Sequence, residues 1–126
     1  MEECGEFNAS KGSVMAMTGT VELDAGVMWG RDLTVGAVGA LKGAWNAIRV
    51  AQAVMERTDH ILLVGEGADR LARLLGLEGH PGPTKRREEQ FHRLRARFRE
   101  YWRRNWEIAR SLGYETVGAV ALDRDG

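Results

Sequence analysis

The feature that most constrains the fold is a run of apolar, β-branched and glycine residues between positions 12 and 41. Thr-Gly and Gly-Arg dipeptides interrupt this run and supply turn residues between shorter pieces that have the composition of strands. Gly36 and Gly39 lie inside the last piece, where glycine weakens a strand and often marks the close approach of another backbone or side chain. We therefore expect three short strands joined by tight turns, with another element packed closely against these two glycines.

The rest of the chain alternates between helical and strand-like patterns. Asn46 is the expected N-cap of a helix over residues 47–58, and residues 60–64 are expected to form a buried strand. Further along come a glycine-rich turn and a helix closed by Gly76, a Pro/Gly break over residues 78–83, a long helical pattern over residues 84–112 and a strand from Thr116. This order predicts a mixed α/β (α+β) chain. Because no further strand follows the one that begins at Thr116, we expect the sheet to continue in residues that are not part of this sequence.

Length and composition limit the class of protein. A chain of 126 residues suits one domain. No apolar run approaches the roughly 20 residues that a membrane-spanning helix needs, and the first twelve residues are acidic and lack the apolar stretch of a secretory signal. Cys4 is the single cysteine, which fits a reducing compartment. We therefore expect a cytoplasmic protein that does not bind a membrane.

Five segments of the chain carry a resemblance to a known family. They read "FNASKGSV" (residues 7–14), "VELDAGVMWG" (21–30), "VGAVGALKGAWNAI" (35–48), "AVMERTDHILLVGEGADRLA" (53–72) and "TVGAVALDRDG" (116–126). Taken together, they resemble the plant-type L-asparaginase / isoaspartyl peptidase family of N-terminal-nucleophile hydrolases. The resemblance implies a part of the four-layer αββα sandwich of those hydrolases.

The resemblance also implies three regions in the chain. Residues 1–80 would be the later part of an α-subunit region, residues 81–115 a Pro/Gly break, basic helical linker and pre-cleavage loop, and residues 116–126 the first strand of a β-subunit region. Family residues that hold the substrate lie beyond position 126, so we expect this stretch alone to be inactive. The intact family assembles as a homodimer of αβ units, and the β-subunit region would be a further partner.

Thr116 is the residue that the resemblance implies as catalytic nucleophile, with Glu115 before the bond that self-cleavage breaks. A threonine hydroxyl is a weak nucleophile unless a base activates it, and an N-terminal threonine uses its own α-amine. That amine titrates at about 7.7–8.0, which suits a general base. The implied reactions are hydrolysis of L-asparagine to aspartate and ammonia, and of β-aspartyl dipeptides. From the pattern alone, Thr116 is a β-branched residue that begins a strand.

A loop over residues 2–12 matches the family's structural sodium site. The resemblance implies that backbone carbonyl oxygens bind the ion, and hard cations prefer oxygen ligands. No other cofactor is required. Asn8 matches an asparagine that supports the surroundings of the nucleophile, although a turn asparagine that bonds its own backbone fits the pattern equally well. The matching sodium positions are Glu2, Cys4, Phe7, Ala9 and Lys11.

Four positions depart from the family pattern. Ser10 stands where glycine is usual, and a serine adds strain there if the backbone needs a positive φ. Trp29 replaces a carboxylate, Ala47 replaces a proline that would begin a helix, and Glu115 stands where glycine or aspartate is common.

Two other function classes are open from the residues. Residues 84–110 hold ten Lys/Arg and four Asp/Glu, a net +6 that leaves −6 for the remainder. A nucleic-acid-binding module could use this segment for phosphate contacts and base stacking, whereas a solvated interdomain helix would turn its aromatic residues inward. A non-catalytic protein could instead pair its exposed strand edge with another chain. The residues that suggest nucleic-acid binding are Arg93, Arg95, Arg97, Arg99, Arg103 and Arg104 with Phe98, Tyr101, Trp102 and Trp106.

Overall fold

The structure, a computed structural model, describes the backbone of residues 2–101 and the side chains of residues 2–96. Within that range no helix is both long enough and apolar enough to cross a membrane. The elements in chain order are a 3₁₀ helix η1 (Ser10–Gly12), strands β1 (Leu23–Trp29) and β2 (Thr34–Leu41), helix α1 (Ala47–Arg57), strand β3 (Leu62–Val64), and helices α2 (Glu66–Leu74) and α3 (Lys85–Tyr101).

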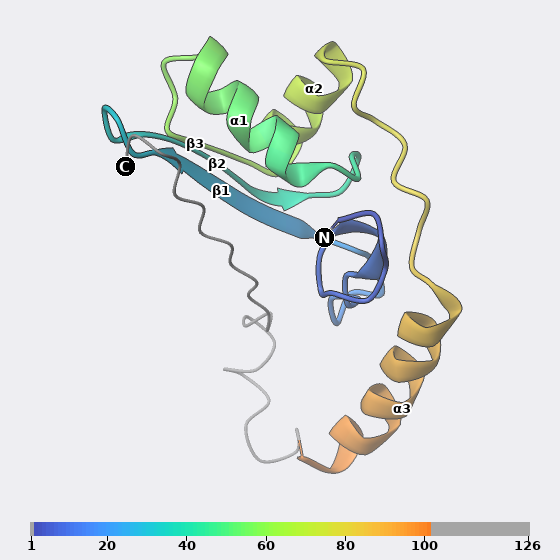
Figure 1. Cartoon of the computed structure of the whole chain (residues 1–126). Coiled ribbons are helices and arrows are strands. Elements are labelled where there is room, and N and C mark those ends of the chain that lie inside the picture. The colour runs from blue at the N-terminus through green and yellow to red at the C-terminus, as the bar shows by residue number, and fades with distance from the viewer. Residues whose placement is uncertain (1, 102–126) are drawn as a thin grey trace.

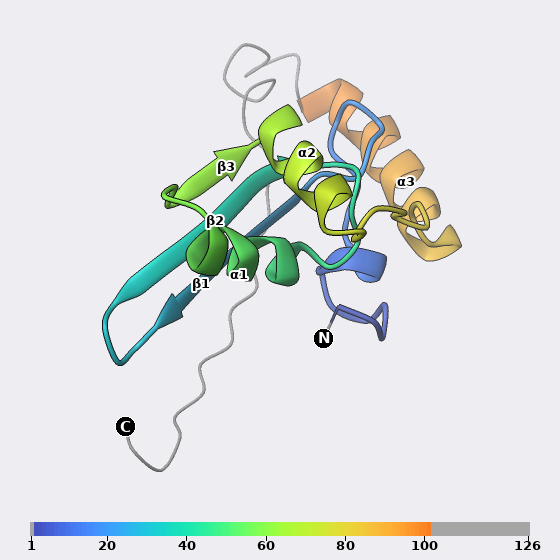
Figure 2. The same cartoon turned by 90° about the horizontal axis from the view of Figure 1, so that it is seen from above.

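The strands form one sheet in the order β1-β2-β3. β1 and β2 are an antiparallel hairpin, whereas β2 and β3 are parallel and are joined through α1, which makes a βαβ unit. Helices α1 and α2 lie on the same face of the sheet (Figure 1). Helix α3 lies apart from both helices, beside the N-terminal segment that contains η1 (Figure 1), and Figure 2 shows the same arrangement from above. The predicted mixed α/β character is confirmed.

The expected first strand of the 12–41 run is wrong. Residues 13–22 form no strand and instead contain a local turn, in which Ala16 N–H donates to Thr20 O and Gly19 N–H donates to Ala16 O, each at 2.8 Å. Gly19 has a φ of +87°, a conformation that glycine adopts readily. Because these hydrogen bonds are local, they use backbone groups of Ala16, Gly19 and Thr20 that a ladder with β1 would need.

The close packing expected at Gly36 and Gly39 is confirmed. A Cβ on Gly36 would collide with the carbonyl oxygen of Ala51 and would lie 2.5 Å from Met55 N, so α1 rests directly on the backbone of β2. A Cβ on Gly39 would lie 3.3 Å from a methyl group of Val64, on the opposite face of the sheet. The close approach explains why the buried cluster consists of small and medium residues: Leu23, Val38, Leu41, Ala44, Ala47, Val50, Ala51, Val54, Ala68 and Ala72.

The strand expected over residues 60–64 is present as the shorter β3, but it is not buried. Leu63 packs against the core, whereas Leu62 and Val64 are 54% and 58% exposed. The reason is that α1 and α2 cover one face of the sheet, and no described element covers the other. An apolar run alone does not tell whether one face or both faces are covered.

The helix boundaries agree with the sequence. Helix α1 begins at Ala47, directly after Asn46, and α2 is followed by Gly76 with a φ of +65°, as expected for a helix-closing glycine. Helix α3 begins at Lys85, after the Pro/Gly break. Phe91 on α3 is buried, but Leu94 is 41% exposed, so the expected apolar stripe is only partly covered.

Candidate functional site

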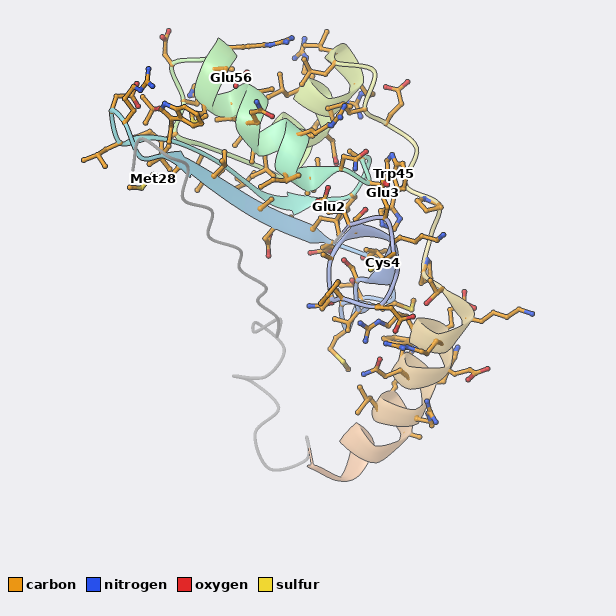
Figure 3. The ribbon with its side chains drawn as sticks, viewed as in Figure 1. Glu2, Glu3, Cys4, Met28, Trp45 and Glu56 are labelled. Carbon is orange, nitrogen blue, oxygen red and sulfur yellow. The ribbon has the colours of Figure 1, made fainter. Side chains whose placement is uncertain are left out.

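The predicted site residues divide into two groups. Glu115 and Thr116, together with the strand predicted over residues 116–126, lie outside the described residues. The six N-terminal positions lie together in one loop, residues 2–13, which we call the N-terminal loop. In Figure 3, Glu2 and Trp45 lie close to the start of α1, Cys4 lies lower in the same loop, and Met28 lies at the other end of the sheet. The loop residues predicted as site residues are Glu2, Cys4, Phe7, Asn8, Ala9 and Lys11.

The loop is closed by its own backbone. Lys11 N–H donates to Glu2 O at 3.3 Å and thereby joins the two ends of the loop. Gly12 N–H donates to Ala9 O at 3.1 Å within η1. A Cβ on Gly12 would collide with Phe7 O and would lie 2.6 Å from Gly5 O. The backbone carbonyl groups of Gly5 and Phe7 therefore lie against Gly12, where only a glycine fits.

Asn8 acts as a local brace. Its side-chain Oδ1 accepts a hydrogen bond from Val14 N–H at 2.8 Å, six residues further along the chain. This contact is close to the interpretation of Asn8 as a turn residue, because its side chain bonds a nearby backbone N–H. It also fixes the point where the chain leaves the loop. The role of Asn8 towards the nucleophile stays a prediction, since Thr116 is outside the described residues.

Ser10, which stands where the family usually has glycine, does adopt a positive φ. Its φ is +47°, in the left-handed region, and only 2% of the residue is exposed. The Ser10 hydroxyl donates a hydrogen bond to the carbonyl oxygen of Trp45, 35 positions away in sequence. The serine therefore takes on a strained backbone and gains a contact with the segment that leads into α1.

Glu2 is a site residue whose side chain the sequence reasoning missed. One carboxylate oxygen accepts from Asn46 Nδ2 and the other from Ile48 N–H, both at 3.2 Å. The carboxylate thus satisfies a free N–H in the first turn of α1 and lies where the helix dipole favours negative charge. Asn46 occupies the cap position but makes no capping hydrogen bond with its own side chain, so that part of the expectation is wrong. No local signal could have revealed this, because the partner lies 44 residues away.

Hydrogen bonds lower the pKa of two exposed groups in the described region. The backbone N–H of Glu6 donates to Cys4 and lowers the pKa of its thiol, which increases the thiolate fraction at neutral pH. In the β1–β2 turn, the Thr34 hydroxyl donates to Asp32 at 2.8 Å and lowers the pKa of that carboxyl. Between residues 2 and 96, no three His, Cys, Asp or Glu side chains are grouped as metal ligands, so a cation in this loop would depend on carbonyl oxygens.

The basic segment is described only in part. Arg93 and Arg95 are exposed on α3, and the guanidinium carbon of Arg95 lies 5.7 Å from the ring centroid of the buried Phe91. The aromatic residues from Phe98 onward, which would stack on bases, lie outside the described side chains. Nucleic-acid binding therefore stays a prediction. Sequence reasoning also missed Arg87, which is buried and bonded to the N-terminal loop.

Comparison with known proteins covers both groups of site residues. The asparaginase family model matches residues 1–126, the whole chain. A plant-type L-asparaginase of Pyrobaculum calidifontis is 46% identical over 129 residues, which cover 100% of this chain and 42% of that protein. The plant-type L-asparaginase of Thermococcus kodakarensis is 43% identical over 98% of this chain and 43% of its own length.

The similarity extends to animals. The human isoaspartyl peptidase/L-asparaginase is 40% identical over 126 residues, which cover 100% of this chain and 40% of that protein. The chain spans about two fifths of the length of these curated relatives. Since the family model and the relatives both match it from end to end, the chain belongs to the family of plant-type L-asparaginases and isoaspartyl peptidases.

Proposed function

We propose that this chain supplies the nucleophile of an amide hydrolase that acts on L-asparagine, on β-aspartyl dipeptides, or on both. The observation that carries the proposal is the family match over residues 1–126, which includes Thr116 and the bond before it. The relatives are named as L-asparaginases and isoaspartyl peptidases. Both activities break an amide bond at the side-chain carbonyl of an aspartyl group, so one site serves both.

Self-cleavage would create the catalytic base. The Thr116 hydroxyl oxygen adds to the carbonyl carbon of Glu115, the C–N bond breaks, and the proton of the hydroxyl passes to the departing nitrogen. The product is an ester that joins Glu115 to the Thr116 side chain and a free α-amine on Thr116. Water then hydrolyses the ester, which releases the Glu115 carboxylate and restores the hydroxyl. The amine, with a usual pKa of about 7.7–8.0, is then half-neutral near working pH.

The same two groups would perform the hydrolysis. The Thr116 amine accepts the hydroxyl proton while the oxygen attacks the side-chain amide carbon of the substrate. The C–N bond of the substrate breaks, and the amine gives its proton to the departing ammonia, or to the amino group of the second residue in a β-aspartyl dipeptide. Water, deprotonated by the same amine, hydrolyses the remaining ester and releases aspartate.

The N-terminal loop would support this site from one side. A hard cation bound to backbone oxygens is compatible with this loop, because Glu2 O and Ala9 O each accept one backbone N–H and keep a second lone pair. A sodium ion would be held by the carbonyl oxygens of Glu2, Cys4, Phe7, Ala9 and Lys11. Its contribution would be to neutralise these dipoles and hold the loop in one shape.

Replacement of Thr116 tests the proposal. We expect Thr116→Ala, in a polypeptide with the full length of the relatives, to remain one uncleaved chain and to consume no asparagine, because the attacking oxygen is gone. Thr116→Ser keeps the hydroxyl, so it is the matched control and should still be cleaved. Intact-mass spectrometry reports cleavage between Glu115 and Thr116, and ammonia release reports hydrolysis. Two subunits from the alanine variant would overturn the assignment.

A further inference from the structure

Arg87 is a buried cation in the segment that leads to the bond before Thr116. Only 9% of the residue is exposed, although it lies in the first turn of α3 among ten basic residues of the 84–110 segment. Its Nε donates a 2.6 Å hydrogen bond to the carbonyl oxygen of Gly12, 75 residues away. One terminal nitrogen donates to Gln90 Oε1 at 2.8 Å. A charged donor makes a stronger hydrogen bond than a neutral one, and a buried guanidinium is costly when these bonds are absent.

The start of α3 is organised around this contact. Thr84 O accepts the N–H groups of Arg87 and Glu88 at 2.8 and 3.0 Å, which begins the helix. Phe91, one turn after Arg87, is also buried and so lies on the same side of α3. Both residues fall on one helical face, which marks that face as the docked side of the helix.

Two further contacts join the same segment to the N-terminal loop. Gly82 N–H donates to His80 Nδ1 at 3.0 Å, so the proton of the neutral ring is on Nε2, which donates to Ser10 O at 3.3 Å. Arg86 lies 3.4 Å from a Glu6 oxygen, an exposed ion pair that contributes little. The buried Arg87 bond is therefore the principal polar link between the loop and α3.

The loop provides a fixed acceptor for this link. Gly12 is buried and cannot be replaced without a collision with Phe7 O, so its carbonyl direction is set by the closed loop. Figure 1 shows α3 beside the N-terminal loop and away from α1 and α2.

We propose that Arg87 is a positioning residue for self-cleavage: it docks the first turns of α3 on the N-terminal loop and so fixes where the 88–114 segment starts on its way to the Glu115–Thr116 bond. This inference rests on the proposed function, because it assigns Arg87 to that cleavage. The proposed role needs no contact between Arg87 and the reacting atoms. Its effect belongs to the precursor, and the mature enzyme, in which the bond before Thr116 is broken, no longer depends on it.

The docking itself is tested without any cleavage. In a full-length Thr116→Ala precursor, we expect Arg87→Gln to reduce the hydrogen-exchange protection of backbone amides in residues 85–96 at least tenfold. Arg93→Gln changes the same charge on the same helix at an exposed position and should leave protection unchanged. Unaltered protection in Arg87→Gln would overturn the docking, whatever the fate of the proposed catalytic activity.

The positioning is tested in the cleavable protein. We expect Arg87→Gln to slow cleavage at Glu115–Thr116 at least threefold relative to Arg93→Gln, with kcat and KM of the matured enzyme unchanged. Arg87→Lys retains one donor for Gly12 O and should recover part of the rate. Equal cleavage rates, or a parallel loss of kcat and thermal stability, would overturn the positioning role. A parent protein that is never cleaved would overturn the proposed function and leave the exchange result standing.

Discussion

Ser10 is buried with a φ of +47°, and its hydroxyl donates a hydrogen bond to the carbonyl oxygen of Trp45. Its backbone conformation therefore lowers the stability of the fold, whereas its side-chain hydrogen bond raises it. A left-handed backbone costs a non-glycine residue about 1–2 kcal/mol, and a hydrogen bond returns about 0.5–1.5 kcal/mol. Alanine keeps the cost of the left-handed backbone and lacks the hydrogen bond. Glycine also lacks the hydrogen bond, but it adopts the left-handed backbone without that cost. We therefore expect Ser10→Ala to be the least stable of the three proteins, about 1 kcal/mol below Ser10→Gly.

Urea denaturation of the three proteins checks this order. Ser10→Gly serves as the control for the lost hydrogen bond, because both variants leave the Trp45 carbonyl without the serine hydroxyl. An alanine variant at least as stable as the glycine variant would show that the left-handed conformation is not retained.

The contrast between Ser10 and Arg87 shows what the sequence could reveal at the scale of one residue. Ser10 stands in a motif where the resemblance expects glycine, so a positive φ could be anticipated, and it is present. Arg87 is one of ten basic residues in its segment, and nothing local distinguishes a buried arginine from a solvated one. Its acceptor is a backbone carbonyl, which leaves no trace in the residue types of either segment.

At the scale of elements, Gly36 decides how closely α1 packs on β2. A Cβ there would meet the Ala51 carbonyl oxygen and the Met55 backbone nitrogen, and backbone atoms of a helix cannot move aside singly. We expect Gly36→Ala to lower the free energy of unfolding by about 2–3 kcal/mol, at the upper end of overpacking costs.

Gly26 is the matched control for that substitution. It lies in the neighbouring strand β1, and a Cβ there would meet only the Ala37 Cβ at 3.9 Å, an ordinary contact. Gly26→Ala should therefore change the unfolding free energy by less than about 0.5 kcal/mol. Equal effects of the two alanines, in urea or thermal denaturation, would contradict the direct helix-on-strand contact.

The elements that the sequence predicted well are those with a strong local signal. The start of α1 directly after Asn46 and the end of α2 shortly before Gly76 were both predicted, and both are confirmed. The segment around Met15 has the composition of a strand, but its backbone forms a local turn at Gly19, whose N–H donates to Ala16 O. β3 was assigned the correct type and the wrong burial, because coverage of a sheet face depends on elements far away in sequence.

For the whole molecule, the open face of the sheet is the feature that connects the described residues to the proposed sandwich. Leu62 and Val64 on β3 are more than half exposed, and Met28 on β1 is 58% exposed. The family's four-layer αββα arrangement would place a second sheet on this face, opposite α1 and α2. Apolar strand residues without a cover are unfavourable in water, so their presence supports this arrangement for the full-length protein.

A charge on that face distinguishes a covered sheet from an open one. In a full-length polypeptide, we expect Val64→Lys to lower the free energy of unfolding by at least about 2 kcal/mol, because a second sheet would bury the ammonium group. Leu74→Lys is the matched control: Leu74 is 79% exposed near the end of α2, outside the proposed sheet interface. It should change stability by less than about 0.5 kcal/mol, since exposed substitutions rarely do more. Thermal and urea denaturation measure both variants. Equal, small effects would mean that β3 faces water in that polypeptide and that the sandwich does not form.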